Sequence, residues 1–143
     1  MRTMTTTRSG MTTRGVVKGL LAGLAGFLLG EYGAGVALTV LAGTGNREAV
    51  LQLAWLPWAL APLLAGVATG LVAGRGRTTP WWYWVAVGAV VPVGAYLVTL
   101  AYFASKGVPT DGLLASSAIQ VVVSSGLALG MGTLRARTEE MAR

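Results

Sequence analysis

The stretch GLLAGLAGFLLGEYGAGVA, Gly19 to Ala37, lies inside an apolar run that extends from about residue 16 to residue 42. A helix that rises about 1.5 Å per residue crosses about 30 Å of hydrocarbon within such a run. Within the quoted stretch the only charged side chain is that of Glu31. The run therefore predicts a transmembrane helix with one carboxyl group close to its centre.

Three further apolar runs have the same character, at about residues 50–74, 81–104 and 112–134. The 143-residue chain is 54% hydrophobic and 11% charged, whereas soluble domains carry about 25% charged residues. Short polar stretches separate the runs, so that sequential helices must be antiparallel neighbours. We expect an all-α integral membrane protein, built as an antiparallel bundle of four transmembrane helices over residues 16–134.

The basic residues predict the orientation of this bundle. Lys and Arg total 11, and only Arg47 and Lys106 lie in the first and third loops. The other nine lie at the two ends of the chain and in the second loop, which by the positive-inside rule are cytoplasmic. We therefore expect a multi-pass protein of the plasma membrane with both termini in the cytoplasm. A cleaved signal peptide fits less well, because the first apolar run is longer than the apolar core of about 7–15 residues in such a peptide.

Two segments outside the apolar runs complete the organisation. Residues 1–15 form a basic, Thr-rich segment, and residues 135–143 form a short charged one. We expect a disordered cytoplasmic tail at the N-terminus and a short charged tail at the C-terminus. The basic groups at both ends are placed to meet anionic lipid headgroups.

The composition also excludes several classes of function. The net charge of +6 could suit nucleic acid, but the basic residues lie at the ends of apolar runs and form no patch with base-stacking aromatic residues. Cys and His are both absent, which removes disulfides, thiolate nucleophiles, His general bases and the usual zinc ligands. We expect no nucleic-acid partner, no catalytic residue, no metal site and no cofactor, and hence no enzyme.

Glycine recurs at helical spacing in three of the four runs. In the first run five glycines fall within about 40° of one line at about 100° per residue. Such stripes let helix backbones approach closely in lipid. We expect helix-packing seams, either within one chain or between subunits of a homo-oligomer or a partner complex, at Gly19, Gly23, Gly26, Gly30 and Gly33, at Gly66, Gly70 and Gly74, and at Gly126 and Gly130.

The chain partly repeats with a period of about 60 residues. GVATGLVAGRGR, residues 66–77, aligns with GLALGMGTLRAR, residues 126–137, and the two segments match at two glycines, one alanine and two arginines. If the repeat is a true duplication, the fold consists of two tandem helical hairpins related by an axis along the membrane normal.

Prolines and aromatic residues mark further features of the spans. Pro57, Pro62 and Pro92 lie inside predicted helices, where the missing N–H should produce kinks. The sequence WWYW, comprising Trp81, Trp82, Tyr83 and Trp84, opens the third run. We interpret it as an interfacial aromatic belt at the level of the headgroups.

The fourth run is the most polar. Ser116, Ser117, Gln120 and Ser124 fall within an arc of about 100° on a helix. Buried hydroxyl and amide groups in hydrocarbon need partners, so we expect this face to point inward. It either makes hydrogen bonds between helices or lines a polar cavity.

Glu31 is the main candidate for a functional residue. Insertion of a charge near the membrane centre costs about 2.5–3.5 kcal/mol, and such acids commonly form proton or cation sites. No basic residue occupies the middle of another run, so Glu31, with its neighbour Tyr32, is either a proton or cation site or a protonated hydrogen-bond donor. On a helix Glu31 lies about 120° around from the glycine stripe, and the surface that it faces is left open.

Two functions are compatible with these features of the sequence. Because few chemically active side chains lie in the spans, the first expectation is a non-catalytic accessory or assembly subunit of a membrane system. The alternative is a small oligomeric transporter or channel, coupled to protons or cations, that uses Glu31 as its intramembrane acid.

Overall fold

The computed structural model describes residues 13–74 and 79–142. In these ranges the chain forms helices and no strands. The helices are α1 (Thr13–Gly43), α2 (Arg47–Leu53), α3 (Leu56–Val72), α4 (Trp81–Lys106) and α5 (Leu113–Met141). The predicted tail at residues 1–12 and the arginines of the second loop lie outside the described residues.

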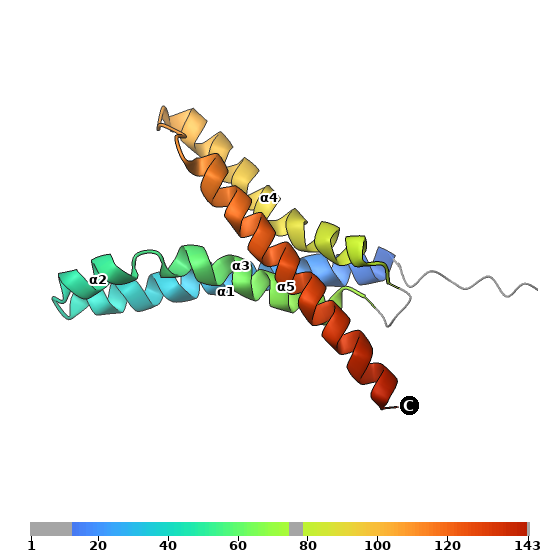
Figure 1. The fold of residues 1–143 in the computed structure, drawn as a ribbon. Coiled ribbons are helices and arrows are strands. Elements are labelled where there is room, and N and C mark those ends of the chain that lie inside the picture. Colours follow the sequence, from blue (N-terminus) through green and yellow to red (C-terminus); the bar gives the residue numbers. More distant parts are fainter. Residues whose placement is uncertain (1–12, 75–78, 143) are drawn as a thin grey trace, which may run out of the picture.

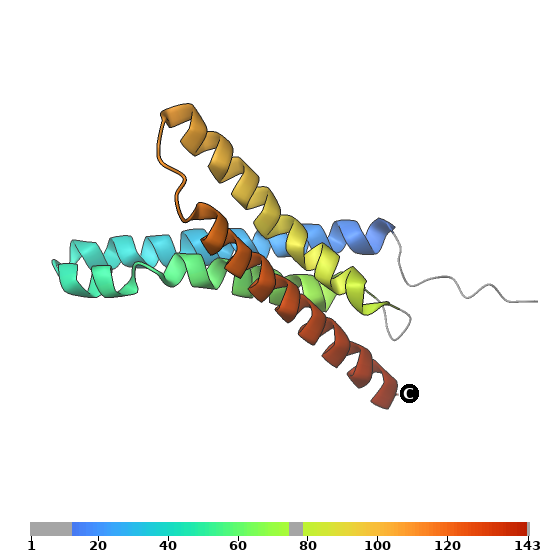
Figure 2. The ribbon, with the colours of Figure 1, turned by 45° about the horizontal axis from the view of Figure 1, so that its top comes forward.

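The helices form two hairpins that cross each other (Figure 1). The first hairpin consists of α1 with α2 and α3, and the second consists of α4 and α5. Contacts between the hairpins run mainly through α3 and α5. The turn ends of the two hairpins diverge in both views (Figures 1 and 2), and the C-terminal part of α5 extends past the crossing and away from the first hairpin.

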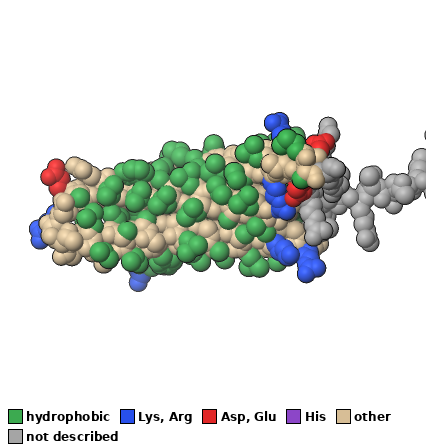
Figure 3. Space-filling view, turned by 90° about the horizontal axis from the view of Figure 1, so that it is seen from below, with side chains coloured by type: hydrophobic (Ala, Val, Ile, Leu, Met, Phe, Trp, Pro, Cys, Tyr) green, Lys and Arg blue, Asp and Glu red, His purple; other side chains and the backbone are tan. Residues whose placement is uncertain are grey.

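The prediction of an all-helical chain with membrane-like helices is confirmed. α1, α4 and α5 are each long and apolar enough to cross a membrane, and α2 with α3 would make a fourth span if the bent pair counts as one. On the face seen in Figure 3, most of the charged side chains lie near the two ends of the molecule, and hydrophobic side chains cover most of the length between them. A regular bundle of four single helices remains a prediction.

The second predicted span is broken. α2 ends at Leu53, α3 begins at Leu56, and the two are bent by 40°. Pro57 lies in the first turn of α3, where the missing N–H costs nothing because no intrahelical acceptor is lost. The span is thus bent beside Pro57, and Pro57 lies at the start of a new helix and not inside a continuous one. Pro62 and Pro92 do lie inside α3 and α4.

α1 and α3 pack through small residues on both sides. A Cβ atom added to Gly19 or Gly23 would overlap the side chain of Ala73 or Thr69. One added to Gly30 would lie 2.6 Å from the backbone of Ala61. These glycines thus have no room for a side chain. The facing segment has small residues at intervals of four: Ala61, Ala65 and Thr69 in α3, and Ala73 directly after it. Gly26 belongs to the same seam and lies against the Leu64 carbonyl.

α3 packs on α5 through Gly66 and Gly70, which lie against the backbone of Ser124 and Ala128. Gly74 lies against the indole of Trp84. Three other predicted packing glycines differ: at Gly33, Gly126 and Gly130 nothing lies within 4 Å of an added Cβ. On α5 the contacts with Gly66 and Gly70 of α3 are made instead by Ser124, Leu127, Ala128 and Met131.

Two close-packed glycines, Gly88 and Gly132, were not predicted. Gly88 of α4 lies against Ala128, and Gly132 of α5 lies against the ring of Trp84. Gly126 and Gly130 of α5, which the repeat aligns with Gly66 and Gly70, therefore do not share their contacts.

The core lies where the hairpins meet. It is formed by Ala73, Tyr83, Trp84 and Val87, with Val16, Leu20 and Leu129 packed against it. Tyr83 and Trp84 are each only 3% exposed, so the prediction that all of WWYW is an interfacial belt is wrong for these two. Successive residues on a helix point about 100° apart, and only Trp81 and Trp82 point outward, with exposures of 67% and 48%.

Side chains from α4 and α5 satisfy the carbonyl groups at the end of α3. The Tyr83 hydroxyl donates to the Ala73 carbonyl over 2.5 Å, and the Arg135 guanidinium donates to the Leu71 carbonyl. Helix ends leave such carbonyls without intrahelical donors. Arg135 also pairs with Glu139 at 2.9 Å on the same helix. α5 extends to Met141, so most of the predicted tail at residues 135–143 is helical.

Candidate functional site

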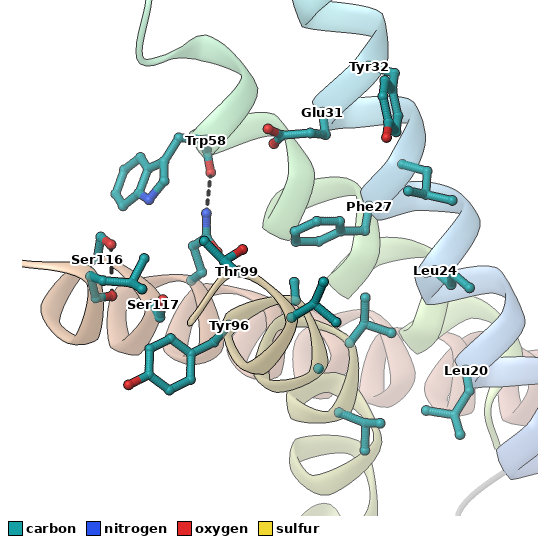
Figure 4. Close-up of a pocket in the computed structure, with 18 of the residues that line it drawn as sticks. Leu20, Leu24, Phe27, Glu31, Tyr32, Trp58, Tyr96, Thr99, Ser116 and Ser117 are labelled. Atoms are coloured by element: carbon teal, nitrogen blue, oxygen red, sulfur yellow. Dashed lines mark hydrogen bonds between the residues drawn. The ribbon is translucent and has the colours of Figure 1, made fainter. Parts of the chain in front are cut away.

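A cavity of about 700 Å³ lies between the two hairpins. Its walls come from α1, α3, α4 and α5. Apolar side chains such as Leu20, Leu24 and Val91 line one part, and Glu31, Thr99 and Gln120 line another. Figure 4 shows Leu20, Leu24 and Glu31 on α1, and Thr99 on α4, around this space.

The packing of α1 on α3 determines where Glu31 points. Gly30 lies against the backbone of Ala61, which fixes the rotation of α1 about its axis. The next residue is turned by about 100°, and Glu31 therefore projects from α1 to the side of the seam. It lines the cavity, and its carboxylate points toward the region where Trp58 lies (Figure 4).

Glu31 is exposed and has no hydrogen-bond or ion-pair partner among the residues that the structure describes. It is also the only charged side chain among the described residues that line the cavity. The surface that the sequence left open is thus the cavity between the hairpins.

Tyr32 is not brought together with Glu31. Its side chain is 69% exposed and projects from a different side of α1, although Tyr32 contributes to the cavity rim. The carboxyl group acquires other neighbours instead. Phe27, one turn earlier, projects to the same side as Glu31, and Trp58 lies across the gap on α3 (Figure 4).

Gln120 joins α5 to α3 at the cavity wall. Its Nε2 donates to the Trp58 carbonyl over 3.3 Å. That carbonyl lies four residues before Pro62 and so lacks its usual donor within the helix. Gln120 supplies the missing hydrogen bond and keeps its own side-chain oxygen as an acceptor.

The predicted polar face of α5 is divided between both of its proposed roles. Ser116, Ser117 and Gln120 line the cavity, and Ser116 also donates to the Leu113 carbonyl of its own helix over 3.0 Å. Ser124 is fully buried between helices and donates to the Gly88 carbonyl over 2.8 Å. Ser125 donates to the Val85 carbonyl over 3.2 Å and was not part of the predicted face.

Sequence reasoning missed the cavity residues Trp58 and Thr99, which α3 and α4 contribute. Their approach to Glu31 depends on how the hairpins cross, and no local pattern encodes that crossing. The prolines inside the helices did indicate one feature. The carbonyl four residues before each proline lacks its helical donor, so a polar side chain from another helix is expected near it.

The chemistry available at the cavity is limited. One carboxylate can accept a proton or attract a cation, and the hydroxyl and amide groups beside it can orient a ligand. In residues 13–74 and 79–142 no three Asp, Glu, His or Cys side chains come together in a group that could hold a metal ion.

No family model matches the chain, and neither a curated protein nor a solved structure matches it.

Proposed function

We propose that the protein is a small membrane transporter or channel, acting as an oligomer, in which Glu31 is the proton or cation site. The observation that carries the proposal is the position of Glu31, which is the sole charged group among the described residues on the wall of a cavity of about 700 Å³ between two hairpins. Ionisable residues at such positions in membrane proteins mark ion pathways and substrate sites.

The shape of the cavity supports this function. Leu20 lines the cavity and also packs on the core cluster of Tyr83, Trp84 and Val87, so the core closes one end. The opposite ends of the hairpins diverge. A site between two helical units that are closed at one end and apart at the other suits alternating access by rocking of one unit against the other.

The charge distribution supports one orientation of this cavity. With both termini in the cytoplasm, the closed end faces the cytoplasm and the diverging turns face outward. Glu31 lies three residues beyond the midpoint of α1, about 5 Å along the axis, and is thus near the membrane centre.

The test is flux in liposomes that contain only this protein. We expect a proton or monovalent cation flux driven by a membrane potential, and its loss in Glu31→Gln. Glu48→Gln is the matched control, because Glu48 is an acid of α2 outside the cavity. Equal flux in wild type and Glu31→Gln would exclude Glu31 as the coupling group.

A second candidate function is that of an accessory or assembly subunit. The diverging hairpins favour it, since they leave large apolar side chains of α1 uncovered toward their turn end, such as Leu29, Val36 and Val40 with exposures of 63–69%. This candidate predicts a stoichiometric membrane-protein partner after purification in mild detergent, measured by native mass, and no flux by the isolated protein.

A further inference from the structure

The cavity between the hairpins changes in polarity along its length. Glu31 lies 11 residues beyond Leu20, which is about 16 Å along the α1 axis. At the Leu20 end the wall is apolar and includes Leu24 and Val91. At the Glu31 end it carries the Thr99 hydroxyl and the Gln120 amide.

The negative charge of the Glu31 carboxylate favours a positively charged ligand. Attraction between opposite charges is stronger where water is displaced by apolar side chains. Phe27 and Trp58 flank the region in front of the carboxylate (Figure 4), and the faces of aromatic rings attract cations. No basic side chain among the described lining residues competes for Glu31.

The same lining argues against a bare metal ion. Ca²⁺ takes about 6–8 oxygen ligands and Mg²⁺ requires near-ideal octahedral coordination. The cavity offers one carboxylate and a few neutral oxygens, and the rest of its wall is mainly apolar. An organic cation needs fewer polar contacts, because its apolar part is stabilised by burial. The volume of about 700 Å³ also falls in the range of about 300–1,000 Å³ that is typical of small-molecule sites.

We propose that the cavity binds an amphipathic organic cation, with the ammonium group at Glu31 and the apolar body directed toward Leu20, Leu24 and Val91. This identifies the class of substrate for the transport function proposed above and rests on that function for its role. Binding itself requires no transport.

The proposal is tested with three probes that share one apolar body: octylammonium, octan-1-ol and octanoate. The protein is placed in nanodiscs of neutral phosphatidylcholine, so that lipid charge does not attract the cation. Quenching or shift of tryptophan fluorescence is titrated, and Trp58→Phe identifies the part of the signal that arises in the cavity. Empty nanodiscs give the partitioning of each probe into lipid.

We expect octylammonium to bind at least about tenfold more tightly than octanol, and octanoate to bind more weakly than either. Glu31→Gln should abolish the preference for the cation and leave octanol binding unchanged. Glu31→Asp, which keeps the charge, should retain the preference, and Glu48→Gln should behave as wild type. A cation preference that persists in Glu31→Gln, or octanoate binding equal to that of octylammonium, would overturn the proposal.

The two proposals fail separately. Binding of octylammonium at Glu31 without flux in liposomes would retain this ligand site and reject the transport function. Flux that depends on Glu31 without a cation preference in nanodiscs would retain transport of protons or inorganic cations and reject the organic ligand.

Discussion

Ser124 donates a hydrogen bond over 2.8 Å to the carbonyl oxygen of Gly88, the residue four positions before Pro92 in α4. Because proline has no N–H, this carbonyl lacks its donor within the helix. Gln120, one turn earlier on α5, does the same for the Trp58 carbonyl before Pro62. One face of α5 therefore compensates both internal prolines, and the prolines fix which face of α5 turns inward.

The first prediction concerns Ser124→Ala. The variant leaves the Gly88 carbonyl without a donor in a fully buried position. Hydrogen bonds between transmembrane helices contribute about 0.6 kcal/mol on average and at most about 1.7, and we expect a loss of stability toward the upper end of this range. The measurement is unfolding in mixed micelles of mild detergent and dodecyl sulfate, followed by circular dichroism.

A double-mutant cycle makes this prediction specific. Pro92→Ala restores an N–H that can pair with the Gly88 carbonyl, so that Ser124→Ala should cost less in the Pro92→Ala background. Ser116→Ala is the control, because Ser116 donates within its own helix. Additive effects of Ser124→Ala and Pro92→Ala would show that the two residues do not act through a shared carbonyl.

The second prediction compares two glycines of α1. A Cβ at Gly30 would lie 2.6 Å from backbone atoms of Ala61, whereas a Cβ at Gly33 meets nothing within 4 Å. Gly30→Ala should separate α1 from α3 and cost about 1–3 kcal/mol, as overpacking does. Gly33→Ala should cause no loss, since alanine favours the helix.

The same unfolding assay measures both variants. Retention of stability in Gly30→Ala would show that the seam tolerates a wider spacing. A loss in Gly33→Ala that is seen only in the oligomer would place Gly33 between subunits.

The helical, membrane-like character of the chain was predictable because the apolar runs are long and their ends are polar. The first seam was predictable too, since Gly19, Gly23, Gly26 and Gly30 repeat at the spacing of one helix face. The break after Leu53 was not, because the pattern at Pro57 fits a kinked helix as well as a helix start. The local geometry, and not the run of apolar residues, decides between them.

The site was predicted only in part. Glu31 stands out because a charge in an apolar run is costly, but its surroundings depend on contacts between segments far apart in the chain. The buried position of Trp84 shows the same limit. The sequence WWYW fits an interfacial belt as well as a core position. Only the contact of the Trp84 indole with Gly132, 48 residues later in the chain, distinguishes the two.

The third prediction tests this distinction between belt and core. Trp84→Ala removes a ring that fills the space beside Gly74 and Gly132, and large-to-small changes of this kind cost about 3–5 kcal/mol. Trp81→Ala removes a ring that is 67% exposed and should change stability by about 0.5 kcal/mol or less. Unfolding in mixed micelles separates the two variants, and equal losses would contradict the core assigned to Trp84.

The fourth prediction tests the orientation in the membrane. The chain has no cysteine, so single cysteines report their own position without background. Thr44 and Val108 are exposed in the turns at the diverging ends of the hairpins, and Thr138 is exposed in the last part of α5. With cytoplasmic termini, a membrane-impermeant maleimide added to intact cells should label Thr44→Cys and Val108→Cys. It should label Thr138→Cys only after permeabilisation.

Thr99→Cys extends the same assay into the cavity. Thr99 lines the cavity on the side of Glu31, so a mouth that opens outward admits the reagent from outside the cell, and octylammonium should slow the labelling if it occupies the site. Labelling of Thr138→Cys in intact cells would reverse the orientation. The cavity mouth would then face the cytoplasm, and a cationic ligand would enter from that side.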